Sequence, residues 1–231
     1  MYGCELWSLD ESRVNNFCIA WGKGLRRICS VPYLGSDIDS DSYSCPEIHR
    51  RLGIAGSIIA QLDNVWRQQK LSLSTKLRIY TSLVQSVVLY GSETWTMRKV
   101  VSDRIQSFHM QALRRILGIR WYDKVSNAVV NERTKLLDVP SLIADRRYSL
   151  FGHICRLLEN TPASQALQLS IEDHTGTPPA ADWKRPPGRP RRNWLQQLEE
   201  DTGLSVGAAW IACQDCSMWR TLRPSAGQAQ Q

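Results

Sequence analysis

Three successive segments of this chain carry apolar residues at spacings of three and four positions. The segments span residues 46–66, 72–88 and 100–117. The stripe of the first segment is formed by Ile48, Leu52, Ala55, Ile59, Leu62 and Trp66. This spacing predicts amphipathic helices that each bury one face. Because the connections between the segments are short, the pattern predicts a mainly α-helical fold built around an antiparallel helical bundle.

Shorter elements and a change of composition divide the rest of the chain. We expect a short strand or turn near 33–36, and short helices at 11–30, 126–135, 141–158, 192–202 and 205–222. Residues 159–190 are rich in Pro, Thr, Ala and Gly, which favours an irregular linker. The expected units are a leading segment 1–32, a strand edge with a bundle at 33–97, a helical region at 98–158, a basic Pro/Gly-rich linker at 159–191, and C-terminal helices with a tail at 192–231.

The charge of the chain favours an anionic partner. It has 29 Lys and Arg against 22 Asp and Glu, a formal net charge of +7, and nucleic acid is the usual partner of such a protein. No apolar run approaches the roughly 20 residues that span a bilayer, and the first residues lack the features of a secretory signal. We therefore expect an intracellular protein of the nucleus or cytoplasm, without a membrane partner, whose seven Cys are free thiols.

The sharpest cationic motif reads Lys184-Arg185-Pro186-Pro187-Gly188-Arg189-Pro190-Arg191-Arg192, with five cations and no acid. Its Pro and Gly residues keep it extended, so it cannot enter a core. A Gly-Arg-Pro core with flanking cations resembles an AT-hook, whose arginine enters the narrow minor groove of A·T-rich DNA. The candidate nucleic-acid contacts are Lys184, Arg185, Arg189, Arg191 and Arg192. The alternatives are a solvated basic linker and a nuclear-import patch.

A second cationic set is expected on the helices. Its members are the pair Arg26 and Arg27, the pair Arg114 and Arg115 with Arg120, and the pair Arg146 and Arg147 with Arg156. Together they could follow a phosphate backbone, with base stacking from Trp121, Tyr122 or Trp194. The alternative for each pair is an ordinary solvated helix face.

The sequence offers no constellation for catalysis or cofactor binding. It has no phosphate-cradling glycine loop, and no Ser-His-Asp arrangement suggests itself. Cys213-x-x-Cys216 is half of a zinc site, and a tetrahedral site needs two more ligands at suitable spacing. We expect no catalytic residue, no metal, no cofactor and no small-molecule substrate. The oligomeric state stays open.

The beginning of the chain recurs in its middle. Tyr2-Gly3-x-Glu5-x-Trp7 and Leu25-Arg26-Arg27-Ile28 return 88 residues later as Tyr90-Gly91-x-Glu93-x-Trp95 and Leu113-Arg114-Arg115-Ile116. The two segments are interpreted as copies of one structural unit, in which the aromatic residues anchor a helix. The residues expected to serve structure are Trp66, Tyr90, Gly91, Trp95, Phe151 and Trp194.

Short motifs also follow one another in a distinctive order. They include Tyr33-Leu34-Gly35-Ser36, Glu47-Ile48-x-Arg50-Arg51-Leu52, Leu89-Tyr90-Gly91-Ser92-Glu93-Thr94-Trp95, Leu113-Arg114-Arg115-Ile116-Leu117-Gly118-Ile119, Trp121-x-Asp123, Phe151-Gly152-His153 and Gly188-Arg189-Pro190-x-x-x-Trp194. This order resembles the region downstream of the palm in non-LTR (LINE-type) retrotransposon reverse transcriptases, often named endonuclease-reverse transcriptases. The likeness covers about residues 32–222.

The resemblance implies roles for these units. Residues 33–97 resemble the palm edge and the thumb that grips template and primer, and 98–158 resemble the post-thumb region. The leading segment 1–32 is then a displaced repeat of post-thumb sequence. Reverse transcriptases bind two metal ions with palm carboxylates, commonly in a Tyr/Phe-x-Asp-Asp turn, and no Asp-Asp dipeptide occurs in this sequence.

The implied function is that of a fragment that binds RNA or DNA without polymerising it. Magnesium would then belong only to the intact parent enzyme. The alternative is a non-enzymatic helical interaction or nuclear-import module, whose basic segment binds acidic partners.

Overall fold

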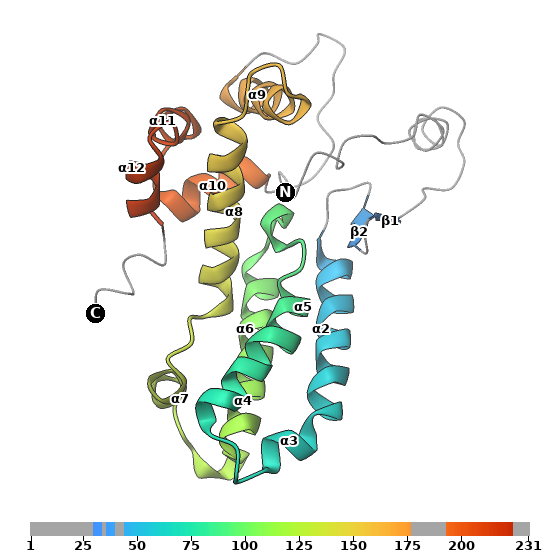
Figure 1. Ribbon diagram of the computed structural model, residues 1–231. Coiled ribbons are helices and arrows are strands. Elements are labelled where there is room, and N and C mark those ends of the chain that lie inside the picture. Colours follow the sequence, from blue (N-terminus) through green and yellow to red (C-terminus); the bar gives the residue numbers. More distant parts are fainter. Residues whose placement is uncertain (1–29, 34–35, 40–43, 177–192, 224–231) are drawn as a thin grey trace.

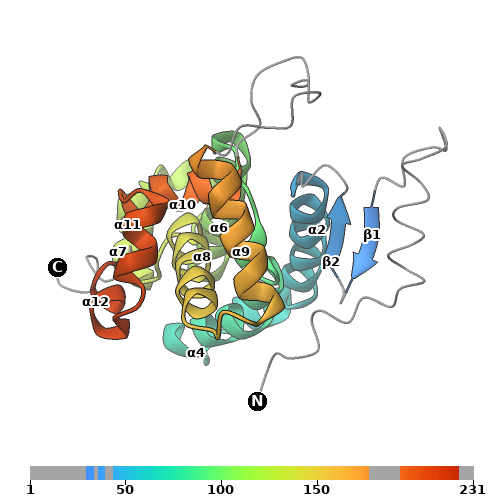
Figure 2. The ribbon, with the colours of Figure 1, turned by 90° about the horizontal axis from the view of Figure 1, so that it is seen from above.

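The computed structural model describes residues 30–33, 36–39, 44–176 and 193–223. Over these residues the chain is mainly α-helical, as predicted (Figure 1). The strands β1 (Ser30–Tyr33) and β2 (Ser36–Asp39) pair antiparallel, and β2 lies beside the first long helix (Figure 2). The sequence predicted a short strand or turn near 33–36; in the structure Tyr33 ends β1 and Ser36 begins β2, and residues 34–35 lie outside the described ranges. The helix expected at 11–30 lies outside the described residues except for Ser30, which begins β1.

The predicted bundle forms from three helical segments, here called legs, that run in alternating directions (Figure 1). The first leg is α2 (Cys45–Gln61) followed by α3 (Asp63–Arg67), the second is α4 (Leu73–Ile79) with a π-helical turn (Tyr80–Gln85) and α5 (Ser86–Val88), and the third is α6 (Lys99–Leu117). A break at Leu62 divides the first leg, which the sequence predicted as one helix.

Local residues explain where these legs begin and end. Pro46 occupies the first turn of α2, where its missing amide hydrogen costs nothing. The Ser72 hydroxyl accepts a hydrogen bond from the Thr75 amide at 3.2 Å and caps α4. Gly91, with φ of 72°, and Gly118, with φ of 69°, take the left-handed conformation that follows the second and third legs.

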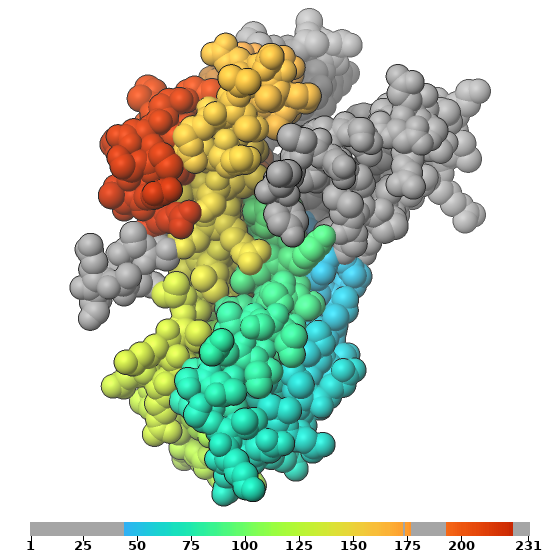
Figure 3. Space-filling model, viewed as in Figure 1, coloured from blue at the N-terminus to red at the C-terminus, as the bar shows by residue number. Residues whose placement is uncertain are grey.

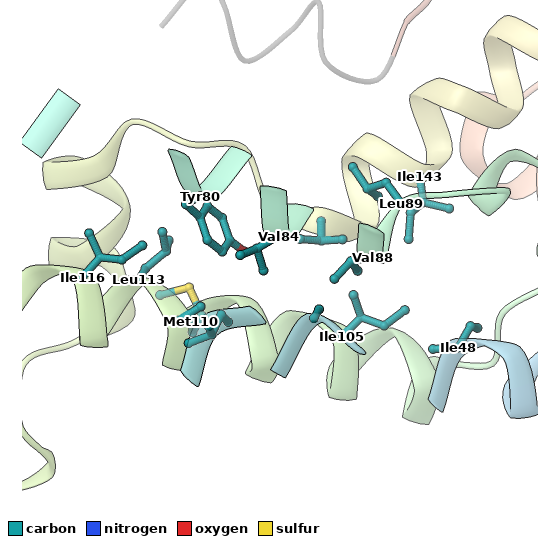
Figure 4. Close-up of a cluster of buried hydrophobic side chains, with 14 of the residues drawn as sticks. Ile48, Tyr80, Val84, Val88, Leu89, Ile105, Met110, Leu113, Ile116 and Ile143 are labelled. Atoms are coloured by element: carbon teal, nitrogen blue, oxygen red, sulfur yellow. The ribbon is translucent and has the colours of Figure 1, made fainter. Parts of the chain in front are cut away.

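The apolar stripes of the three legs meet in one hydrophobic core (Figure 4). Its fully buried side chains include Ile48, Ala55, Tyr80, Val84, Ile105, Leu113, Val130 and Ile143. Burying such side chains supplies most of the free energy that stabilises the bundle. The same core fixes the end of α6, from which the candidate site projects.

The second half of the chain forms a second hydrophobic core, and one long helix contributes side chains to both cores. Helix α7 (Asn127–Thr134) still packs on the first core, where Val130 is buried. The second core is formed by α8 (Val139–Cys155), α9 (Pro162–Thr175), α10 (Trp194–Thr202), α11 (Val206–Ala212) and α12 (Cys216–Thr221). Helix α8 places Val139 and Ile143 in the first core, and Tyr148 and Phe151 in the second. In Figure 3 its yellow surface connects the bundle with the orange and red C-terminal helices.

Two expectations for this half are corrected. Helix α9 occupies residues that the sequence predicted as irregular linker. Pro162 stands at the start of α9, where proline favours a helix, and Leu167 packs into the second core. The single helix expected at 205–222 is divided, because Asp215 accepts hydrogen bonds from the Ser217 and Met218 amides and starts a new helix there.

None of the helices that the structure describes is both long and apolar enough to cross a membrane.

Candidate nucleic-acid interface

The loop after α6 projects two aromatic side chains into solvent. It lies at the end of the bundle next to α3 (Figure 1). Trp121 is 92% exposed and Tyr122 is 52% exposed. Residues Trp121–Asp123 form a 3-10 turn that Asp123 closes, because its carboxylate accepts a hydrogen bond from the Arg120 amide at 2.6 Å. The exposed aromatic residues therefore stand on an ordered turn.

Arg120 holds the second of these rings in place. Its Nη1 donates a hydrogen bond to the Tyr122 hydroxyl at 2.7 Å, and its Cζ lies 5.8 Å from the centre of the Tyr122 ring. The rings of Trp121 and Tyr122 stand 5.8 Å apart at 77°. We call Arg120, Trp121 and Tyr122 the aromatic tip.

Arg114 braces this loop against α6. Its Nη1 donates to the Val125 carbonyl at 2.8 Å, and its Nη2 donates to Asn127 Oδ1 at 2.6 Å. The sequence predicted a phosphate contact for Arg114. In the structure the guanidinium makes hydrogen bonds within the protein, to the residues that follow the aromatic tip.

Arg115 lies at the rim of a hollow beside the tip. It shares Asp63 with Arg67: the carboxylate Oδ1 lies 2.7 Å from Arg115 Nη2, and Oδ2 lies 2.6 Å from Arg67 Nη2. The Arg115 hydrogen bond and the charges of both arginines hold the pKa of Asp63 below its usual value. The arginine side chains stay accessible, at 45% and 79% exposed.

The hollow itself has a volume of about 420 Å³. Its lining consists of Asp63, Trp66, Arg67, Arg115, Gly118, Ile119 and Arg120. Three arginines and one carboxylate thus line the hollow, and Asp63 pairs with two of them, Arg67 and Arg115. The resulting positive charge suits an anion such as a phosphate.

Two further predicted contacts lie on α8, away from the tip. Arg146 is partly exposed and donates to the Leu89 carbonyl at 2.7 Å. Arg147 is 1% exposed, pairs with Asp201, and donates to the Trp95 carbonyl at 3.2 Å. The expectation that Arg147 contacts nucleic acid is corrected, because its guanidinium serves inside the fold. The other predicted contacts, Lys184, Arg185, Arg189, Arg191 and Arg192, lie outside the described residues.

The residues expected to serve structure occupy several environments. Trp66, Trp95 and Phe151 are buried, and Trp66 Nε1 donates to the Ile59 carbonyl at 3.1 Å. Trp194, which was also considered for base stacking, is half-buried.

The Nε1 of Trp194 donates to the Glu93 carbonyl at 2.9 Å. Tyr90 is half-exposed, with Arg51 Cζ 4.3 Å above its ring, while Gly91 supplies the turn described above.

The structure adds two residues that the sequence did not single out. Asp63 and Arg67 stand four positions apart on α3, a spacing that itself signals a helical ion pair. The ion pair between Asp63 and Arg115 joins α3 to α6, so no local sequence pattern could have revealed it. Within the described ranges, no group of three His, Cys, Asp or Glu side chains could hold a metal ion, and Cys213 of the half-site is buried.

Comparison with known proteins gives one informative similarity. The chain is 24% identical over 173 residues to an uncharacterized transposon-derived protein of Caenorhabditis elegans. The aligned region covers 73% of this chain and 58% of the worm protein, so the chain spans little more than half the length of that relative. No protein-family model matches the sequence, and no solved structure matches it. The similarity supports a transposon-related origin.

Proposed function

We propose that this chain is a nucleic-acid-binding fragment of a non-LTR retrotransposon reverse transcriptase. The similarity to a transposon-derived protein supports an origin in a transposable element. The order of motifs favours the thumb and post-thumb region of a LINE-type enzyme. The binding role rests chiefly on one observation: an ordered, exposed aromatic pair stands beside a hollow lined by Arg67, Arg115 and Arg120.

The cations supply the affinity in this proposal. Each Lys or Arg that meets a phosphate releases condensed counterions, which makes association favourable at low salt. Arg67, Arg115 and Arg120 offer such charges at the end of the bundle. The segment 184–192 would add a second contact. The partner is RNA, DNA or both.

The proposal includes no catalysis by this chain. Polymerisation needs paired carboxylates that hold two metal ions, and the sequence contains no Asp-Asp dipeptide. We therefore assign no magnesium site and derive no metal-dependent step.

An interaction module is the second candidate, and one observation favours it. The segment 184–192 carries five cations without an acid, which suits an acidic protein as well as a phosphate backbone. Competition separates the two candidates. An excess of polyglutamate should displace a labelled oligonucleotide poorly if the chain is built for nucleic acid.

Charge reversal tests the basic segment directly. Arg189→Glu, Arg191→Glu and Arg192→Glu together should weaken binding of a labelled oligonucleotide by about tenfold or more, because three phosphate contacts are lost. Fluorescence anisotropy with the full chain measures this. The matched control reverses Arg220, an exposed residue of α12. An unchanged isotherm for the triple variant would remove the segment from the interface.

Primer extension tests the absence of catalysis. The full chain, an annealed template and primer, Mg²⁺ and deoxynucleotides should give no extended product. Extension that survives repurification of the chain would contradict the proposal.

A further inference from the structure

We infer that the aromatic tip binds an unpaired nucleobase by stacking, and that the arginine-lined hollow beside it holds the adjoining phosphate. This inference rests on the proposed function and deepens it. It names the substrate class as single-stranded nucleic acid and the contact as Trp121 with Tyr122.

The exposure of Trp121 demands an explanation. Tryptophan is highly buried on average in folded proteins, yet this side chain is 92% exposed. The turn that carries it is ordered by the Asp123 carboxylate on one side and by the Arg114 brace on the other. The fold therefore holds this turn, and with it the Trp121 ring, at the surface. An exposed aromatic pair of this kind is typical of a ligand-binding site.

The geometry of the two rings suits a flat ligand. Trp121 and Tyr122 stand at 77° with centres 5.8 Å apart, so they form a corner. A planar base can lie against one ring while its edge meets the other. The hydrogen bond from Arg120 fixes the Tyr122 ring in advance, which lowers the entropy lost on binding.

The neighbouring charge completes a nucleotide site. Arg120 belongs to the aromatic tip and also lines the hollow, where Arg67 and Arg115 share one carboxylate. An anion in the hollow would meet an excess of positive charge. A base and its phosphate are covalently joined, so adjacent stacking and cationic subsites match one nucleotide unit.

The substrate must expose the face of a base. In a duplex each face is covered by the next base pair, whereas bases of single strands can splay out and stack on aromatic residues. Stacking is tolerant of sequence because every base has such a face. We therefore expect preference for single strands over duplex without strong sequence preference.

The test compares three fluorescein-labelled probes of about 15 nucleotides, within the usual range of a single-strand site. They are a single-stranded oligothymidylate, its duplex with oligoadenylate, and an abasic strand with the same phosphates. For the full wild-type chain we expect the intact strand to bind about tenfold more tightly than the abasic strand. This comparison needs no variant.

Substitution then locates the effect. The variant W121A/Y122A should bind the intact strand as weakly as the abasic one. The control Leu169→Ala removes an exposed apolar side chain from α9 and should retain the difference. A double variant that still distinguishes the strands would overturn the inference.

The outcomes separate this inference from the proposed function. A wild-type chain that binds neither strand at low salt would overturn the function and the inference together. A chain that binds intact and abasic strands equally would overturn the inference alone. That second outcome would assign the exposed aromatic pair to a protein contact instead.

Discussion

A buried hydrogen bond between two titratable side chains joins two legs of the bundle. The Tyr80 hydroxyl and His109 Nδ1 lie 2.7 Å apart, and both residues are buried. Burial lowers the pKa of His109 to about 4, although the charge of Asp138 opposes the shift. Burial also raises the pKa of Tyr80. The pair is therefore neutral near pH 7, as its apolar surroundings require.

This pair predicts how stability depends on pH. An unfolded histidine titrates near 6.5, so between pH 6.5 and about 4 the unfolded chain binds more protons than the folded chain at His109. As the pH is lowered from 6.5 to about 4, the free energy of unfolding should therefore fall by up to about 3 kcal/mol. Urea unfolding at several pH values measures the slope.

Two variants show whether the slope belongs to His109. His109→Gln should flatten it, because the titrating group is gone. His153→Gln removes an exposed histidine and should leave the slope unchanged. Equal slopes in wild type and His109→Gln would show that another group is responsible.

The arginine residues show how far the sequence predicts the role of a single residue. Arg114, Arg115, Arg120 and Arg147 look alike in the sequence, and all were expected to contact phosphate. The structure separates them by their partners: Arg147 pairs with Asp201 inside the fold, while Arg115 reaches the surface hollow. These partners are distant along the chain, so a local pattern cannot reveal them.

A stacked aromatic pair joins α8 to α12. The rings of Tyr148 and Trp219 stack at 3.7 Å with an angle of 9°. Tyr148 Oη donates to the Trp219 carbonyl at 2.6 Å, and Trp219 Nε1 donates to the Tyr148 carbonyl at 3.2 Å. Gly152, one turn further along α8, leaves room for the indole.

Gly152→Ala should therefore destabilise the protein. A methyl group there would meet Trp219 Nε1 and lie 2.6 Å from Trp219 Cδ1, so the rigid indole must move. We expect a loss of about 1–3 kcal/mol, typical of an overpacked core. Thermal unfolding monitored by circular dichroism measures it.

Gly53→Ala is the matched control for this change. Gly53 lies on an exposed face of α2, and an added Cβ would meet nothing within 4 Å. Alanine there should stabilise the helix by about 0.5–1 kcal/mol. If both substitutions changed stability in the same direction, the packing argument at Gly152 would be wrong.

The helices whose apolar residues recur at regular helical spacing could be predicted from the sequence. The second and third legs follow the stripes at 72–88 and 100–117, because those stripes fill one core. Helix α9 was missed because its Pro-, Thr- and Ala-rich neighbourhood resembles a linker, and its burial depends on a core built by other helices. The break at Leu62 has no counterpart in the stripe, which runs on unchanged to Trp66.

At the scale of the whole molecule, polar contacts attach the C-terminal helices to the bundle. The Gln197 side chain accepts from the Met97 amide at 2.7 Å and donates to the Met97 carbonyl at 3.2 Å. Trp194 donates to Glu93, and Arg147 on α8 donates to Trp95. The segment 93–97 is thus held by residues 52 to 101 positions away along the chain. A mainly helical fold was predictable from the sequence, but this docking was not.

Binding of nucleic acid through its cations is the property expected of the whole chain. The most direct measurement is the affinity of the full chain for a labelled single-stranded oligonucleotide, determined by fluorescence anisotropy over a series of salt concentrations. The chain should bind at low salt, and its affinity should weaken steeply as salt is added. The logarithm of the association constant should fall linearly with the logarithm of the salt concentration. Absence of binding even in dilute buffer, or an affinity that does not change with salt, would contradict it.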